Sequence, residues 1–143
     1  MKVLAVSISE RKGIKKHPVE YIELIEDYGI DGDAHAGKWH RQVSLLGVES
    51  MEAMKEKLPT LSAGDFAENI LTEGIVLYKL PIGTILKVGE CILEITQIGK
   101  ECHLGCEIRH IVGDCVMPRE GIFTKVIKGG KIKADDKIEI VEK

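Results

Sequence analysis

The pattern of apolar and polar positions predicts a chain made mainly of short β-strands. Apolar residues alternate with polar ones, or run together over short stretches, in residues 3–8, 19–25, 43–46, 84–88, 91–96, 121–127 and 137–141. Gly89 and Glu90 separate two of these stretches as a hairpin turn, and Gly129 and Gly130 turn the chain before Ile132. Many short strands with such turns predict a mostly β fold, either a sandwich or a small barrel.

One segment has helical periodicity instead. In residues 48–58 the apolar side chains recur near the helical period, the polar ones take the opposite face, and Pro59 ends the run. We therefore expect one main helix there. Residues 29–33, with two Gly and two Asp, predict a turn, and residues 106–111 a short helix or an ordered loop.

Composition narrows the class of protein. The 143 residues predict one domain, 1–143, and the scarcity of aromatic residues predicts a core of Ile, Val and Leu. A net charge of −3 makes nucleic acid a poor candidate partner. The apolar runs are too short for a signal sequence or a membrane span, so we expect a cytoplasmic protein with no membrane partner. In a cytoplasmic protein, the four cysteines are expected to be free thiols, metal ligands or catalytic groups in preference to disulfides.

Three of the four cysteines cluster in one segment. Cys102, His103 and Cys106 follow one another in the spacing C-H-x-x-C, and Cys115 follows after eight residues. Thiolates are nucleophiles and soft-metal ligands, and nearby cations favour the anion. Four ligands would suit structural zinc, although the usual C-x2-C pairs are absent. Cys91 lies among alternating apolar residues and is predicted to be a core residue.

A second constellation occupies residues 31–44. Its cations and polar groups could hold an anion: Lys38 as a point charge, Arg41 as a planar fork, His40 by a hydrogen bond. Asp31, Asp33 and His35 could instead hold a metal, or the Asp side chains could bond backbone amides in a solvated turn.

A weaker third feature, residues 64–70, contains Glu68 and Asn69. These side chains could line a pocket, or the segment could be an ordinary turn before a strand.

The order of these motifs resembles the MOSC domain family, in its small stand-alone bacterial form. The resemblance rests on short motifs that follow one another along nearly the whole chain: Gly29-Ile30-Asp31-Gly32-Asp33-Ala34-His35, His40-Arg41-Gln42-Val43-Ser44, Gly64-x-Phe66-x-Glu68-Asn69-Ile70, Ile82-Gly83 with Val88-Gly89, Gly99-Lys100-x-Cys102-His103, and Arg119-Glu120-Gly121-Ile122-Phe123 before Gly129-Gly130-x-Ile132. It implies a β-barrel-like fold with a main helix and short helical turns, and a role in sulfur transfer to the molybdenum cofactor or in binding that cofactor.

The resemblance also implies roles for individual residues. Cys102 resembles the cysteine that binds molybdenum in reductases of the wider family, so it would carry a persulfide or ligate the metal. His103 would help to hold the thiolate, and Cys106 or Cys115 would resolve or co-ligate it. The residues expected to contact the cofactor phosphate or an oxyanion are His35, Lys38, His40, Arg41, Asn69 and Arg119.

The expected cofactor is molybdopterin-bound molybdenum, or its precursor. In eukaryotic sulfurases the domain follows a pyridoxal-phosphate cysteine desulfurase domain, which this sequence lacks, so pyridoxal phosphate is not expected on this chain. Any sulfurtransferase-like catalysis would then need a cysteine desulfurase or a molybdoenzyme as partner. Two alternatives stay open: a molybdenum-dependent reductase of N-hydroxylated compounds, and a non-catalytic domain with structural zinc.

Overall fold

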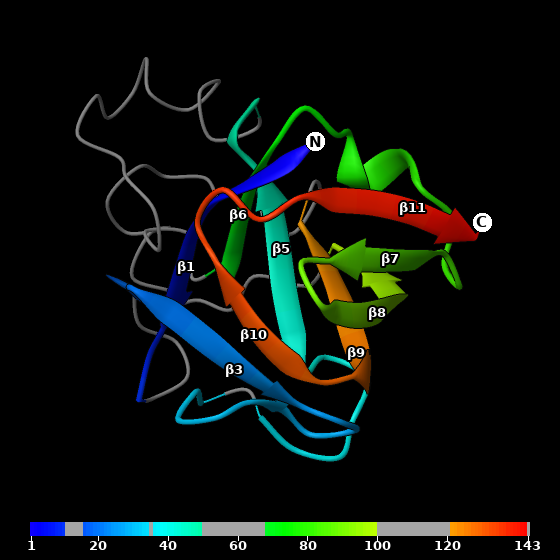
Figure 1. Cartoon of the computed structure of the whole chain (residues 1–143). Helices are drawn as coiled ribbons and strands as arrows, with labels where there is room; N and C mark the ends of the chain where they lie inside the picture. The colour runs from blue at the N-terminus through cyan, green and yellow to red at the C-terminus, as the bar shows by residue number, and fades with distance from the viewer. Residues whose placement is uncertain (11–15, 35, 50–67, 100–120, 143) are drawn as a thin grey trace, which may run out of the picture.

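The computed structural model describes residues 1–10, 16–34, 36–49, 68–99 and 121–142, which form two β-sheets (Figure 1). The larger sheet has the strand order β11-β7-β8-β9-β5-β6-β1-β2, and the smaller has the order β10-β3-β4. The strands of the larger sheet are β1 Lys2–Ile8, β2 His17–Val19, β5 Val43–Gly47, β6 Ile70–Glu73, β7 Ile85–Val88, β8 Cys91–Ile98, β9 Ile122–Lys128 and β11 Ile138–Glu142. Those of the smaller sheet are β3 Tyr21–Ile25, β4 Gly29–Ile30 and β10 Gly130–Lys133. The mostly β prediction is confirmed.

The pairing of neighbouring strands is antiparallel, with one parallel pair, β5 with β6. The predicted hairpin is present: β7 and β8 pair from Val88 and Cys91 outward, and Gly89 has the positive φ of 59° that such a tight turn favours. The sequence did not single out β6 as a strand. It is short and lies between its partners β5 and β1.

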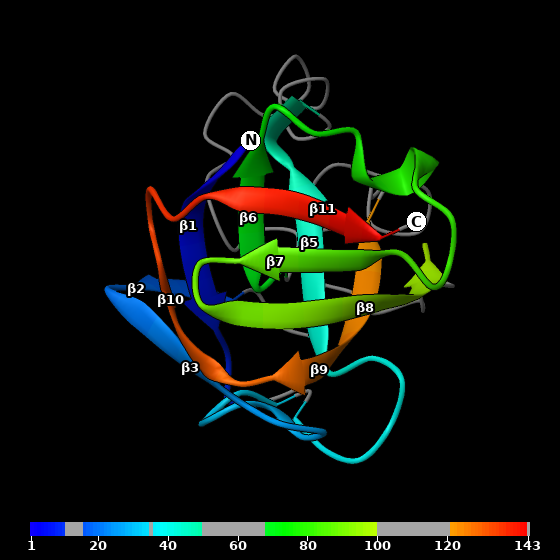
Figure 2. The ribbon, with the colours of Figure 1, turned by 45° about the vertical axis from the view of Figure 1, so that its right-hand side comes forward.

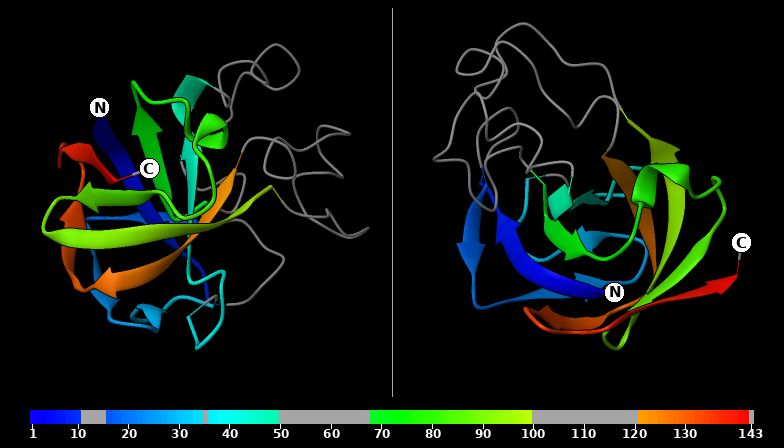
Figure 3. Two further views of the ribbon diagram at one scale, coloured as in Figure 1. Left: turned by 90° about the vertical axis from the view of Figure 1, so that its right-hand side faces the viewer. Right: turned by 90° about the horizontal axis from the view of Figure 1, so that it is seen from above.

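The prediction of a barrel is only partly right, because the larger sheet does not close. Its strands wrap around a common interior (Figure 2, Figure 3), yet β11 and β2 are the two ends of the ladder. The start of β1 lies beside the residues that lead into β11. Lys2 and Lys137 form an isolated bridge there, and the Val3 amide donates to the Asp136 carbonyl oxygen at 2.8 Å. Further along, β1 is paired with β6 on one side and β2 on the other, so no edge of β1 remains there for β11.

The helical predictions have a different outcome. Val48 and Glu49 have helical backbone, and the rest of the predicted helix, residues 50–58, lies outside the described residues. Within the part that is described, no main helix is found, and the one named helical element is the 3-10 helix η1, Leu77–Lys79. The segment 106–111 is likewise outside the described residues. None of the helices in the described ranges has the length and apolar character that crossing a membrane requires.

The predicted single strand 19–25 is two strands in different sheets. The chain leaves β2 at Val19 and enters β3 at Tyr21, so that one residue, Glu20, separates the two sheets. Pro18 lies in β2 opposite Ser7, at the end of the larger sheet, where its missing amide hydrogen leaves no neighbour unpaired. The predicted turn at residues 29–33 begins with the two-residue strand β4 before it turns.

The core lies between the two sheets and is aliphatic, as predicted. Its buried cluster contains only Val, Ile and Leu side chains together with Cys91 among the described residues. At the corner where β9 leads into β10, Gly129 passes so close to β3 that a Cβ there would overlap with the Leu24 carbonyl oxygen. This close approach lets the chain step from the larger sheet to the smaller one.

Candidate functional site

The predicted site residues divide into two groups. Four of them, Lys38, His40, Arg41 and Asn69, are in the described part of the chain. The remaining ones lie outside the described residues, and their predicted roles stay predictions: Cys102, His103, Cys106, Cys115, Arg119 and His35.

The described residues that flank the cysteine segment are bonded to each other. The Gly99 amide donates a hydrogen bond of 2.7 Å to the Gly121 carbonyl oxygen. The last residues of β8 and the first of β9 pair directly before this bond, Ile98 with Ile122. Gly99 and Gly121, the described residues on either side of positions 100–120, therefore lie together at the end of the β8–β9 ladder.

The loop before β5 reaches the same place through His40. Its Nε2 lies 2.8 Å from the Gln97 side-chain oxygen Oε1, and Gln97 Nε2 donates to the Gly99 carbonyl oxygen at 2.7 Å. The His40 carbonyl oxygen also accepts a hydrogen bond from the Thr96 hydroxyl. A continuous set of contacts thus joins the predicted anion-binding loop to the residue that precedes the cysteine segment.

Arg41 is held by aromatic rings. Its guanidinium carbon lies 4.7 Å from the centre of the Trp39 ring and 5.8 Å from that of Phe123. Its Nε is buried and has no hydrogen-bond partner within the described ranges. A cation that is stabilised by ring faces keeps its N–H donors for a ligand. We call Lys38, Trp39, His40, Arg41 and Gln97 the loop cluster.

Lys38 is an exposed cation whose field is partly opposed by Asp27. The pKa of Asp27 lies below its ordinary value of 3.8, first because Gln42 donates a hydrogen bond to it, and then because of the charges of Lys125 and Lys38. Gln42 makes that bond at 3.2 Å, and Lys125 lies 3.4 Å from the same carboxylate oxygen. The Asp27 carboxylate therefore offsets part of the Lys38 charge.

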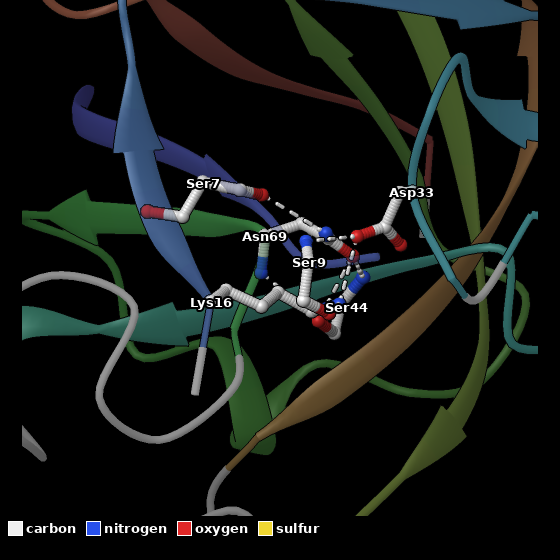
Figure 4. Close-up of polar contacts among 6 residues, drawn as sticks. All are labelled: Ser7, Ser9, Lys16, Asp33, Ser44 and Asn69. Carbon is white, nitrogen blue, oxygen red and sulfur yellow. Dashed lines mark hydrogen bonds and ion pairs between the residues drawn. The ribbon is translucent and has the colours of Figure 1, made fainter. Parts of the chain in front are cut away.

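Asn69 is buried and holds three strands together. Its Oδ1 accepts hydrogen bonds from the Ser44 amide at 3.0 Å and the Ser44 hydroxyl at 3.1 Å, and its Nδ2 donates to the Ser7 carbonyl oxygen at 3.1 Å (Figure 4). Since Ser44 lies on β5 and Ser7 on β1, this amide links both neighbours of β6. The contacts present are structural, and the predicted cofactor contact of Asn69 stays a prediction.

A buried ion pair that the sequence did not indicate lies beside Asn69. Lys16 Nζ is 2.8 Å from Asp33 Oδ1, and both side chains are completely buried (Figure 4). The Ser9 amide donates to the same oxygen at 3.1 Å, and the Ser9 hydroxyl accepts from Lys16 at 3.1 Å. We call the six residues drawn in Figure 4 the interior cluster: Ser7, Ser9, Lys16, Asp33, Ser44 and Asn69.

Neither interpretation of the Asp residues in the 31–44 loop describes Asp33 fully. Its side chain accepts a backbone amide hydrogen, as in the turn interpretation, but the amide is that of Ser9, the side chain is buried instead of solvated, and the Lys16 ammonium also donates to it. His35, the third residue of the metal interpretation, lies outside the described residues. Asp31 is exposed. In the described ranges, no group of three or more His, Cys, Asp or Glu residues is arranged to hold a metal ion.

Cys91 is a core residue, as predicted. Its side chain is 0% exposed and lies within the aliphatic cluster. Burial, together with the negative charges of Glu90 and Asp136, raises the pKa of the Cys91 thiol from 9.0 to about 12. A neutral, enclosed thiol is neither a nucleophile nor a metal ligand at neutral pH.

Comparison with known proteins gives a family and a set of related folds. The model of the MOSC domain family matches residues 32–139, which is more than half of the chain. No curated protein matches the chain in sequence.

Similar solved structures include three from bacteria. The YuaD protein from Bacillus subtilis has a TM-score of 0.78 at 19% identity, covering 96% of this chain and 93% of that one. YiiM from Geobacillus stearothermophilus has a TM-score of 0.76 at 18% identity, covering 99% of this chain and 75% of that one. YiiM from Escherichia coli has a TM-score of 0.71 at 20% identity, covering 100% and 71%. At such identities the likeness concerns the fold alone.

Proposed function

Because the chain belongs to the MOSC domain family, we propose that it is a molybdenum-cofactor-associated protein whose Cys102 thiolate carries a persulfide sulfur or ligates molybdenum. The loop cluster would bind the anionic part of the ligand. The expected partners are the cofactor or its precursor, and a cysteine desulfurase or molybdoenzyme.

One observation carries this proposal: the contacts from His40 through Gln97 to Gly99. Gly99 is three positions before Cys102 in the sequence, and its amide is bonded to Gly121 on the far side of the cysteine segment. The loop with the cations and the root of the segment with the thiols are therefore neighbours. A site that handles an anionic sulfur or metal species needs both kinds of group within reach of one ligand.

The donor set of the loop cluster fits an anionic group. Arg41 offers N–H donors from a guanidinium that rests on aromatic rings, and its buried Nε lacks a partner among the described residues. Exposed Lys38 and His40 add a point charge and a ring nitrogen. These residues, with His35 and Arg119, would neutralise a pterin phosphate or an oxyanion such as molybdate. When bound, the cofactor would supply a metal that accepts a sulfur ligand.

The chain itself would act through the Cys102 sulfur. In the carrier role, the Cys102 thiolate attacks the terminal sulfur of a persulfide on a cysteine desulfurase. A new S–S bond forms on Cys102, the old one breaks, and the desulfurase cysteine leaves as a thiolate, so no external oxidant is required. Lys100, His103 and Arg119 would favour the attacking thiolate by their charge, and Cys106 or Cys115 could release the sulfur afterwards by disulfide formation.

Cyanide-labile sulfur tests the carrier role. The full chain is incubated with a cysteine desulfurase and cysteine, separated from both, and treated with cyanide, and the thiocyanate formed is measured. We expect close to one labile sulfur per chain, lost in Cys102→Ala and retained in Cys91→Ala, because Cys91 is enclosed in the core. Labile sulfur and molybdate binding that are both unchanged in Cys102→Ala would overturn the proposal. Metal analysis of the purified protein would separate molybdenum from zinc.

A further inference from the structure

Gln97 belongs to the site, although nothing in the sequence motifs points to it. It lies near the end of β8, where the pairing with β9 shifts between Ile95, opposite Thr124, and Gln97, opposite Phe123. Thr96 is therefore an extra residue, which is the arrangement of a β-bulge. Such a bulge reorients the side chains that follow it, and here Gln97 extends to His40 instead of continuing the inward row of Cys91, Leu93 and Ile95.

The contacts of Gln97 fix the orientation of its amide group. The Gly99 carbonyl oxygen can only accept a hydrogen bond, so the atom of Gln97 that lies 2.7 Å from it must be the NH2 nitrogen. The Gln97 oxygen then faces His40 Nε2 at 2.8 Å. Because an amide oxygen can only accept, His40 Nε2 must carry a hydrogen.

We propose that Gln97 is a positioning residue that holds the His40 ring with hydrogen on Nε2 and directs Nδ1 toward the bound anion. A bare Nδ1 lone pair would repel an anion, so Nδ1 takes up a proton from solvent when the anion binds and then donates to it. The role toward a ligand rests on the proposed function, whereas the state of the ring does not. The ring is further located by Trp39, whose centre lies 5.9 Å from that of His40 at an interplanar angle of 68°. Trp39 also contacts Arg41, so one aromatic side chain helps to position both His40 and Arg41, the two residues expected to donate hydrogen bonds to the anion.

The first experiment measures the ring state without any ligand. Long-range 1H–15N NMR spectra of the 15N-labelled chain are recorded at a pH of about 8. His40 is assigned by comparison with His40→Gln. We expect one tautomer, with hydrogen on Nε2 and a ring N–H signal that is protected from exchange with water.

Two variants of Gln97 separate its two contacts. Gln97→Glu keeps an oxygen that can accept from Nε2 but loses the donor to Gly99, so the Nε2–H tautomer persists. Gln97→Leu loses both contacts, so the second tautomer becomes visible and the ring N–H signal is lost by exchange. Thr96→Val is the matched control. It removes a hydroxyl that donates to the His40 and Phe123 carbonyl oxygens and, within the described ranges, makes no hydrogen bond to the His40 ring, so it leaves the ring state unchanged. A wild-type ring with hydrogen on Nδ1, or a ring state that is identical in Gln97→Leu, would overturn the proposal.

The second experiment tests which ring nitrogen meets the anion, with molybdate as the probe. The amide nitrogen of an Asn side chain occupies a position close to that of Nδ1, and that of Gln a position close to that of Nε2. His40→Asn therefore retains molybdate affinity, and His40→Gln loses about tenfold or more. Equal losses in the two variants would overturn the assignment of Nδ1. A wild-type chain that binds no molybdate would contradict the proposed function, and the NMR result on Gln97 would then be judged by itself.

Discussion

The interior cluster and the loop cluster are both polar, and they differ in whether their groups are satisfied within the protein. In the interior cluster two fully buried charges face each other and share Ser9, and the Asn69 amide is bonded on both sides. In the loop cluster His40 is exposed, and Arg41 has a buried Nε without a partner in the described ranges. Buried polar groups that are satisfied by one another hold strands together, whereas donors that lack a partner are available to a ligand.

Removing the buried ammonium should have the largest effect on stability. Lys16→Met leaves the Asp33 carboxylate fully buried without its 2.8 Å cationic partner, and removing one member of such a pair costs about 3–5 kcal/mol. Urea unfolding measures this as a lower free energy of unfolding. The double variant Lys16→Met/Asp33→Leu should recover much of the loss, because the Asp33 carboxylate is removed together with its cationic partner.

Lys2→Met is the matched control. Lys2 also pairs with an aspartate, Asp135, but at 3.7 Å and with side chains 44% and 82% exposed. Water screens this pair, so the expected cost is about 0–1 kcal/mol. If Lys16→Met lowers the free energy of unfolding no more than Lys2→Met does, the buried ion pair stabilises the fold no more than an exposed one, and the interior cluster does not hold the strands together.

Asn69→Ala tests whether Asn69 stabilises the fold or binds the ligand. The variant leaves the Ser44 amide, the Ser44 hydroxyl and the Ser7 carbonyl oxygen without the Asn69 side chain, at an expected cost of about 2–3 kcal/mol. Thr72→Val is the control, on strand β6, which begins directly after Asn69. The Thr72 hydroxyl is buried without a partner among the described residues, so its removal should be neutral or slightly stabilising. A fall in molybdate affinity with unchanged stability in Asn69→Ala would instead place Asn69 in the binding site.

Local pattern in the sequence predicted much of the fold. Strands β1, β7, β8, β9 and β11 follow from alternation, short apolar runs and turn residues, because a strand with one buried face must alternate. Strand β5 follows from a short apolar run and is buried throughout. The division of residues 19–25 between two sheets was not predictable, since the pairing partner changes at Glu20 and the identity of a strand's partner is not a property of its local sequence. Whether a sheet closes depends on long-range register, which short-range periodicity does not contain.

The candidate site was predictable where residue chemistry is distinctive. The loop with Lys38, His40 and Arg41 stands out by its density of cations and donors. Lys16 was missed, because nothing in its neighbours distinguishes a buried lysine from a solvated one. Gln97 had one available signal: continued alternation from Cys91, Leu93 and Ile95 would place this polar side chain at an inward position.

Within the loop cluster, Arg41 should contribute more to anion binding than Lys38. Arg41→Met removes a guanidinium that rests on Trp39, and molybdate affinity should fall about tenfold or more, roughly 1.4 kcal/mol. Lys38→Met removes an exposed charge that Asp27 already opposes, so a loss of only a few fold is expected. Isothermal titration calorimetry at fixed ionic strength compares the two. Equal losses would mean that the aromatic support of Arg41 has no bearing on binding.

The last prediction concerns whether water reaches the core around Cys91. Burial raises the pKa of Cys91 to about 12, so the folded chain keeps this thiol neutral while the unfolded chain ionises it near its ordinary value of 9.0. Above pH 9 the unfolded state therefore binds fewer protons than the folded state, so the free energy of unfolding falls as the pH rises. The contribution of the neutral Cys91 thiol to stability is fully present below pH 9 and is lost as the pH rises toward 12.

Cys91→Ala should flatten this decline, which urea unfolding at several pH values between about 8 and 10.5 can measure. The comparison is between slopes, because the smaller side chain also lowers stability by a constant amount at every pH. Iodoacetamide should leave Cys91 unmodified in the native protein and alkylate it after unfolding. An equal slope in both proteins, or alkylation of Cys91 in the native state, would show that water reaches the interior and that its polar groups need not be satisfied by one another.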